Sequence, residues 1–253
     1  MYSTSCENIA IFVKIKRQLI ELLNRRKSMN HLYCYKMTWD TEFAPNPHHG
    51  VLTLATCKPV MRRCAKVGDW ISGWAAKTVH DLMGCHRFPT GKTLIYIAQI
   101  TDIIPMEEYW HRFPQKRPSR IAPLESNSNS GCGKNMTPAQ QTVACKKHGI
   151  GDLNTGDNIY KPLIENPDYS NPLHWEQIEN RNHEKSMTLH DLSGKRVLIC
   201  ETFTYFGVRN AKEISTEIFG YDIPRYKKIA LNDPNVVNLI SHVNEYYENG
   251  IVK

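Results

Sequence analysis

The stretch between two predicted strands, residues 38–50, carries side chains that are suited to holding a planar ligand. Trp39, Asp40, Phe43 and Asn46 all lie within it, beside two prolines. Aromatic rings stack on nucleobases at about 1–3 kcal/mol per base, and a carboxylate or an amide can hydrogen-bond the edge of a base held in a pocket. The pattern favours a nucleobase-binding loop, and the alternative is that the two rings fill one end of the core.

Further candidates lie far along the chain. Asp157, Asn158 and Tyr160 follow a glycine at 156, and these residues form either a β-turn or a pocket rim that presents a carboxylate and an amide. Trp70 begins one predicted strand and Tyr205 ends another. Each of these two rings either lines the pocket or packs in the core.

Phosphate contacts would come from basic side chains close to these groups. Lys36, Lys58 and Arg62 are the candidates, provided that the fold gathers them, and the alternative is an ordinary solvated surface. The net charge of +7 is unevenly placed, because residues 1–30 hold six Lys and Arg against two Glu, and residues 105–150 hold seven against three. An anionic partner would meet these two segments first.

Metal and nucleophile chemistry find little support in the sequence. Cys132, Cys145 and His148 lack the close cysteine pair of most structural zinc sites, so neither a metal nor another cofactor is predicted. The chain has no G-x-S-x-G, P-loop or G-x-G-x-x-G motif. The enzymatic alternative is an acid–base set of Asp40, Asp157 and His48, which requires the fold to bring them together.

The elements that must position these residues are mainly strands. We expect strands at 31–37, 51–56, from 70 onward, at 94–104 and at 195–206, short helices after Pro59 and around 211–219, and a last helix that begins at Asp233 and is closed by Gly250. Residues 94–104 are apolar on both faces, which predicts a barrel wall with a helix packed outside.

Two segments fall outside this core. Residues 1–29 read as an amphipathic leader helix for a homo-oligomer or a protein partner, with a membrane or nucleic-acid surface as the alternative. Residues 111–155 read as an irregular insertion, so residues 30–253 form a single domain. No apolar run reaches about 18 residues, which argues against a membrane span. The eight cysteines show no C-x-x-C pair and no disulfide framework, and no secretory leader is visible, so we expect the protein in the cytoplasm.

The order of short blocks resembles the PUA-like superfamily, which includes EVE and ASCH domains, and resembles more closely the nucleotide modification associated domain type 2 family. The blocks, which span about residues 31–210, are Tyr35-Lys36, Ala44-Pro45-Asn46, Cys57-Lys58-Pro59, Gly68-Asp69-Trp70-Ile71, Gly156-Asp157-Asn158-Ile159-Tyr160 and Tyr205-Phe206-Gly207. The resemblance implies an α+β fold, a PUA-like mixed β-barrel with flanking helices. It also implies a module that binds a modified nucleobase, in nucleic acid or in a nucleotide, and a link to DNA base modification systems of bacteria or phages.

Overall fold

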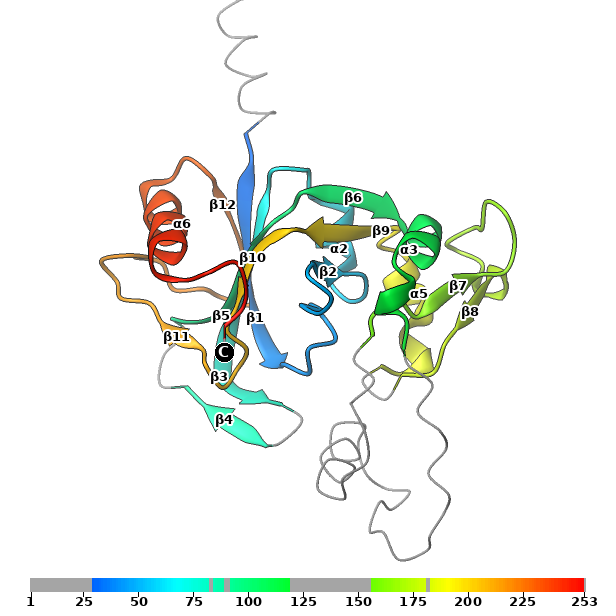
Figure 1. The fold of residues 1–253 in the computed structure, drawn as a ribbon, viewed down its shortest axis with the longest axis horizontal. Coiled ribbons are helices and arrows are strands. Elements are labelled where there is room, and N and C mark those ends of the chain that lie inside the picture. The colour runs from blue at the N-terminus through cyan, green and yellow to red at the C-terminus, as the bar shows by residue number, and fades with distance from the viewer. Residues whose placement is uncertain (1–28, 82–83, 89–91, 119–155, 181–182, 253) are drawn as a thin grey trace, which may run out of the picture.

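The computed structural model describes residues 29–81, 84–88, 92–118, 156–180 and 183–252, and in them the chain forms three sheets and a few helices (Figure 1). The eight-stranded sheet is mixed: β1–β3 and β10–β13 are parallel pairs, and the other pairs are antiparallel. Its order is β12 (Tyr226–Ala230), β1 (His31–Trp39), β3 (Trp70–His80), β5 (Thr93–Gln99), β10 (Thr202–Tyr205) and β13 (Gly250–Ile251), with β4 (Cys85–Arg87) on β3 and β11 (Lys212–Glu213) on β5.

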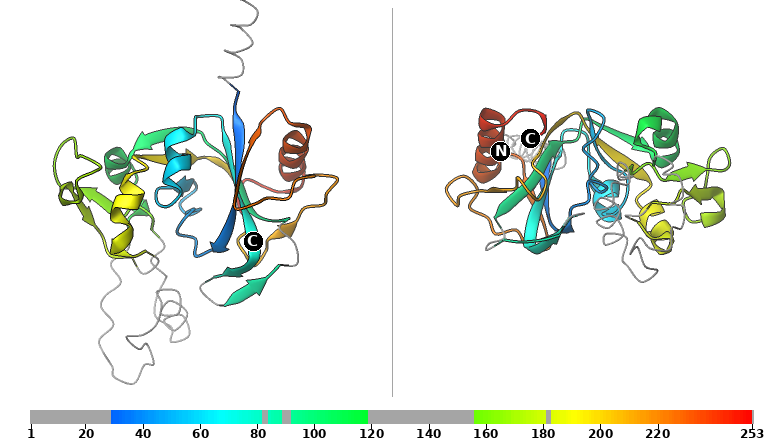
Figure 2. Two further views of the ribbon diagram at one scale, coloured as in Figure 1. Left: turned by 180° about the vertical axis from the view of Figure 1, so that it is seen from behind. Right: turned by 60° about the horizontal axis from the view of Figure 1, so that its bottom comes forward.

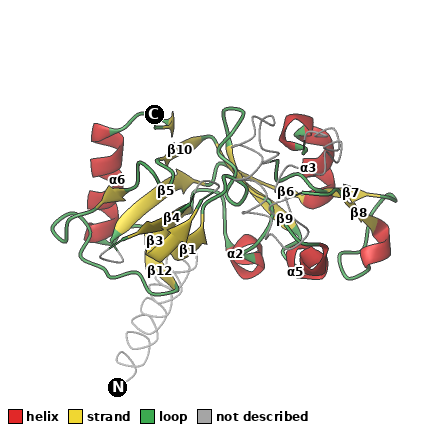
Figure 3. Ribbon diagram, turned by 90° about the horizontal axis from the view of Figure 1, so that it is seen from below, coloured by secondary structure: helices red, strands yellow, loops and turns green. Residues whose placement is uncertain are grey.

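The second group of elements lies on the opposite side of the large sheet from α6 (Pro234–Tyr246) (Figures 1 and 3). Its sheets are β2 (Leu52–Leu54), β9 (Arg196–Cys200) and β6 (Asp102–Pro105), and the pair β7 (Tyr160–Pro162) and β8 (Trp175–Gln177). Its helices are α2 (Pro59–Cys64), α3 (Met106–Arg112) and α5 (Thr188–Leu192), with single turns η1 (Pro114–Lys116), η2 (Pro172–His174) and η3 (Lys185–Met187).

Two segments pass from the large sheet to the second sheet, and both views in Figure 2 show this junction near the centre of the molecule. The expected strand 94–104 is divided into β5 and β6, and the expected strand 195–206 is divided into β9 and β10. The two corners, between β5 and β6 and between β9 and β10, are hydrogen-bonded to each other. The Thr101 N–H donates to the Ile199 carbonyl at 2.8 Å, and the Glu201 N–H donates to Thr101 Oγ1 at 3.1 Å. The fold is therefore α+β with a large mixed sheet, and none of the described sheets closes into a barrel.

Strand β5 is buried on both faces, as its sequence predicts. A bulge falls opposite Gly73 and Trp74, where Ile95 is the extra residue between paired Leu94 and Tyr96. Ile95 and Tyr96 therefore both pack toward the second sheet, while Leu94 packs toward α6. The large sheet is thus the middle layer between two apolar cores.

The last helix begins as predicted and ends early. The Asp233 side chain accepts the Asn235 N–H, and Pro234 occupies the first turn. The helix ends at Tyr246, so Gly250 belongs to β13 and does not close it. The predicted helix at 211–219 is wrong: the chain pairs with β5 as β11, and Phe219 stacks on Trp74 with ring centroids 5.0 Å apart. Tertiary packing overrides local propensity there.

The predicted leader, apart from its last residue, lies outside the described residues, as does most of the predicted insertion. Residues 111–118 are described, and Lys116 among them is fully buried. Its ammonium donates to the carbonyls of Asn46 and Val51 and to the Asn46 side chain at 2.6–3.0 Å. Within the described part of the chain, no helix is both long and apolar enough to cross a bilayer.

Candidate functional site

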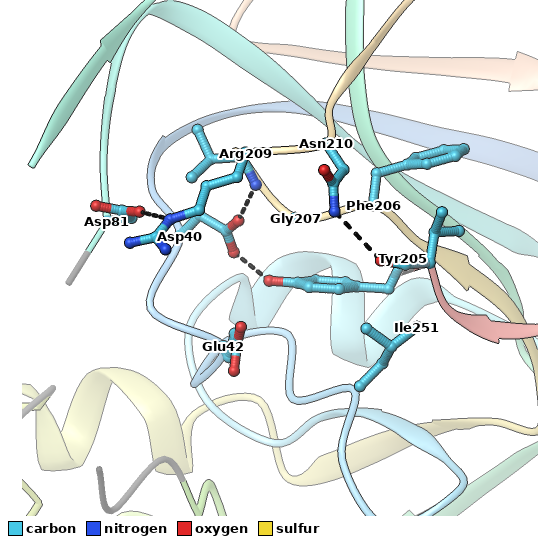
Figure 4. A pocket seen from close by; sticks show the side chains of 11 residues that line it. Asp40, Glu42, Asp81, Tyr205, Phe206, Gly207, Arg209, Asn210 and Ile251 are labelled. Atoms are coloured by element: carbon cyan, nitrogen blue, oxygen red, sulfur yellow. Dashed lines mark hydrogen bonds and ion pairs between the residues drawn. The ribbon is translucent and has the colours of Figure 1, made fainter. Parts of the chain in front are cut away.

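A cavity of about 210 Å³ lies where the loop after β1 meets the segment after β10 (Figure 4). Ligand sites for drug-sized molecules span roughly 300–1,000 Å³, so this space suits a single ring system. It is lined by Asp40, Glu42, Asp81, Tyr205, Phe206, Gly207, Val208, Arg209, Asn210, Ile251 and Val252.

The carboxyl of Asp40 is the central polar group of this cavity. The residue is only 5% exposed. One oxygen accepts the Tyr205 hydroxyl, and the other accepts the Val208 N–H at 2.7 Å. Burial raises the pKa of Asp40 to about 6, although both hydrogen bonds act in the opposite direction. Near neutral pH the group can therefore accept a hydrogen bond as a carboxylate or donate one as an acid.

The backbone on both sides fixes this carboxyl. The Asp40 N–H donates to the His80 carbonyl at 2.8 Å, which continues the pairing of β1 with β3. Gly207 has φ of +68°, a region that glycine enters without strain. The turn that follows β10 thereby brings the Val208 N–H to Asp40. Residues 165 positions apart meet because both strands end at this edge of the large sheet.

An ion pair forms part of the wall of the cavity. The Arg209 Nε donates to Asp81 Oδ2 at 2.8 Å, and the His86 ring lies 3.2 Å from the same oxygen. Arg209 is the single basic residue among the eleven that line the cavity, and its side chain is 56% exposed. A guanidinium held in this way still presents donors to an anionic group, such as phosphate, that enters from solvent.

A column of phenols runs from this carboxyl into the core. The Tyr205 ring lies 6.3 Å from that of Tyr96, whose hydroxyl is 2.6 Å from the Tyr35 hydroxyl. The Lys58 ammonium lies 4.5 Å from the centre of the Tyr35 ring, and it forms no ion pair with the described residues. Burial lowers the pKa of Lys58. Its φ of 43° is a strained backbone for a residue other than glycine, which is typical of functional positions.

Several other predicted ligand residues lie in the interior and line neither this cavity nor the second one described below. Asp157 is fully buried and accepts the Tyr109 hydroxyl at 2.6 Å and the Thr53 hydroxyl at 2.8 Å. Burial raises its pKa, which the charge of Lys116 opposes. The Asn158 amide donates to the backbone carbonyls of Tyr109 and Phe113. The fold therefore places Asp157 in a different network from Asp40.

Arg62 belongs to a third buried network. Its guanidinium is fully buried and donates to the carbonyls of Cys57, Arg196 and Asp191. The Asp191 carboxylate accepts the Tyr160 hydroxyl at 3.0 Å and lies 2.6 Å from the His183 ring. All three guanidinium nitrogens of Arg62 thus donate to protein carbonyls. A contact with phosphate would require these hydrogen bonds to break.

The remaining candidates are dispersed. Trp39 is 46% exposed and stacks on His80 at 4.7 Å. Phe43 is buried, with its ring 5.3 Å from that of His183. Lys36 is half-buried on β1, the buried Asn46 binds Lys116, and Trp70 lines a second cavity. Of the twelve predicted ligand residues, Asp40 and Tyr205 are the two that this cavity brings together.

Sequence reasoning missed the acidic and basic partners around Asp40. Asp81 is followed by Gly84, whose N–H its carboxylate accepts at 2.7 Å, and this spacing was a readable turn signal. Arg209 lies just beyond the block that ends at Gly207. Val208 contributes only its backbone N–H, which leaves no signal in residue type.

Metal ligands do not gather in the described residues. No group of three or more His, Cys, Asp and Glu side chains there could hold a metal ion. Cys132, Cys145 and His148 lie outside the described residues.

Comparison with known proteins confirms the closer of the two family resemblances seen in the sequence. A family model described as nucleotide modification associated domain 2 matches residues 29–252, a range that contains all of the described residues. Neither a curated protein nor a solved structure matches the chain. The match spans the large sheet, both smaller sheets and the Asp40 cavity. The chain therefore belongs to the nucleotide modification associated domain 2 family.

Proposed function

We propose that the protein is a binding module that holds a nucleobase, in nucleic acid or in a nucleotide, in the Asp40 cavity as part of a DNA base modification system. The observation that carries this proposal is the buried Asp40 carboxyl at the wall of a cavity of about 210 Å³. The family supplies the link to nucleotide modification. The large sheet and the second sheet, which the β5–β6 and β9–β10 segments connect, would be the part of this module that corresponds to a PUA-like barrel.

The Asp40 carboxylate selects for hydrogen-bond donors. Tyr205 donates a hydrogen bond to one oxygen and Val208 donates one to the other. Each carboxylate oxygen can accept a second hydrogen bond. Adenine, cytosine and guanine carry exocyclic amino groups, whereas thymine has none and presents a carbonyl where cytosine has its amino group. A base that carries an amino group, modified or not, should therefore bind better than thymine.

The size of the cavity sets how the base is presented. Space for one ring system excludes a stacked duplex, so the base must come from a single strand, a flipped-out nucleotide or a free nucleotide. Arg209 at the wall would contact the adjoining phosphate, with Lys58 and Lys36 as further phosphate contacts. The exposed ring of Trp39 would stack on a neighbouring base.

The test is binding of short fluorescent single strands that differ in one central base, measured by anisotropy at several pH values and salt concentrations. Asp40→Asn keeps the shape of the side chain but replaces one acceptor by a donor, so it should weaken binding about tenfold or more. Arg209→Ala should weaken binding and reduce its salt dependence. Lys161→Ala is the matched control, because it removes a cation from an exposed pair with Glu176 that does not line the cavity.

The pH series separates this site from non-specific attraction. Binding should strengthen as the pH rises through about 6, where Asp40 becomes a carboxylate. The proposal is wrong if no nucleotide or strand binds at low salt, or if Asp40→Asn binds every strand as tightly as the wild type does.

An enzymatic function is the second candidate, and the raised pKa of Asp40 favours it. A carboxyl whose pKa is about 6 suits a general base near neutral pH. In that case Asp40 would act with Tyr205, because Asp157 belongs to another network. Turnover of a nucleotide that survives in Asp40→Asn would exclude this role for the carboxyl.

A further inference from the structure

A second cavity, of about 300 Å³, lies at the C-terminal end of α6 against β3, β5 and β10. It shares no residue with the Asp40 cavity. None of its lining residues carries a charge, although the chain has a net charge of +7. The eight residues are Trp70, Ile97, Thr202, Phe203, Thr204, Asn244, Tyr247 and Asn249.

Two of these residues, Trp70 and Tyr247, supply aromatic rings, whereas the Phe203 ring packs in the core on the opposite face of the large sheet. Trp70 is 7% exposed, so its ring is fixed in the fold. The Tyr247 ring is held edge-on by Phe206, with centroids 4.8 Å apart. Rigid aromatic walls favour a planar ligand, because ring stacking adds to the gain from burial.

Two polar groups of the cavity have no partner among the described residues. The indole N–H of Trp70 donates to none of them, and the nitrogen remains accessible. The exposed Asn244 amide likewise makes no hydrogen bond with the described residues. Together they offer two kinds of donor and one acceptor to a ligand.

The neighbouring amide is already engaged in holding the wall. Asn249 Oδ1 accepts the Phe203 N–H at 2.6 Å, and Asn249 Nδ2 donates to the Glu201 carbonyl at 3.1 Å. These two bonds fix the segment between α6 and β13 onto β10. Asn249 therefore holds the wall of the cavity in place, whereas the Asn244 amide stays available to a ligand.

From these contacts we propose a second binding site that takes an uncharged planar heterocycle, such as a nucleoside or a free base. The ring lies between Trp70 and Tyr247, accepts the indole N–H, and meets the Asn244 amide with its polar edge. A phosphate is not recognised here, because none of the lining residues is a cation and the Lys212 ammonium is engaged over the Tyr247 ring, 5.9 Å from its centre. This site is separate from the Asp40 cavity and does not depend on the function proposed for it.

The test follows the indole N–H groups of the full-length ¹⁵N-labelled protein by NMR as adenosine is added. Trp70→Phe identifies the Trp70 cross-peak by its loss. As adenosine is added, the chemical shift of that cross-peak should change until it reaches a plateau. AMP should bind no more tightly than adenosine does. Asn244→Ala should weaken adenosine binding about fivefold or more. Asn244 is exposed, so this substitution leaves the fold intact.

Two control variants make the outcome specific. Glu245→Ala changes an exposed neighbour on α6 that does not line the cavity and should leave adenosine binding unchanged. Asp40→Asn should also leave the shift of the Trp70 indole unchanged, which separates this site from the first. The proposal is overturned if the Trp70 cross-peak stays in place up to the solubility limit of adenosine, or if Asn244→Ala binds adenosine as the wild type does.

Discussion

The buried carboxyl of Asp40 should make the stability of the protein depend on pH, and Asp40→Asn removes that dependence. Burial raises the pKa of Asp40 from its ordinary value of 3.8 to about 6. The folded protein therefore binds this proton more tightly than the unfolded chain does. The stability that the proton contributes is fully present below about pH 4 and is lost as the pH rises through about 6.

The expected size follows from the two pKa values. They differ by about two pKa units, and each unit corresponds to about 1.4 kcal/mol, so the effect is about 3 kcal/mol. Asparagine does not titrate, and its carbonyl can still accept the Tyr205 hydroxyl. The free energy of unfolding of the wild type, minus that of Asp40→Asn, should fall by about 3 kcal/mol between about pH 3 and about pH 7.

Urea titrations of both proteins across this range measure that difference. The other titrating groups are shared, so their contributions cancel. Asp168→Asn is the matched control, because the backbone N–H of Ser170 lowers the pKa of the exposed Asp168 and the corresponding difference should rise with pH. A difference that is flat, or that grows with pH, for Asp40→Asn would refute the reasoning.

Three further substitutions test the packing around the site by urea or thermal unfolding. Gly68→Ala should lower the free energy of unfolding by roughly 1–2 kcal/mol or more, because φ is +88° and the new Cβ would lie 2.5 Å from Asn30 Nδ2; an unchanged midpoint would contradict this. Arg62→Met should cost about 3–5 kcal/mol, since three buried carbonyls lose their donor, and a raised melting temperature would refute it. Tyr109→Phe should cost about 1–3 kcal/mol, more at neutral than at acidic pH because the hydroxyl stabilises ionised Asp157; an equal cost at both would be evidence against an ionised Asp157.

Features set by neighbours in sequence were predictable. The start of α6 follows from Asp233 and Pro234, which satisfy the first turn of a helix whatever packs on it. The turn at Gly68 follows in the same way: Gly68 adopts φ of +88°, and the Asp69 carboxylate accepts the N–H groups of Lys66 and His31, both at 2.8 Å. These signals act over a few residues, so a pattern of residue types contains them.

The division of the long strands was not predictable, because the apolar pattern continues through both corners. Leu94 to Ile104 stays apolar and extended, and neither glycine nor proline marks Thr101. What changes there is the partner: β5 pairs with β3 and β10, whereas β6 pairs with β9. Hydrogen-bonding partners distant in sequence decide where a strand ends, and local periodicity carries no record of them.

The two aspartates proposed for an acid–base set show how far residue type can be taken. Asp40 and Asp157 are both buried, both accept a tyrosine hydroxyl, and burial raises the pKa of both. Asp157 is enclosed by Thr53, Tyr109 and the charge of Lys116, so its lone pairs serve the core. Asp40 has the same chemistry at the wall of a cavity. A ligand can reach the carboxyl that has open space beside it, and it is the tertiary fold that places the space beside Asp40.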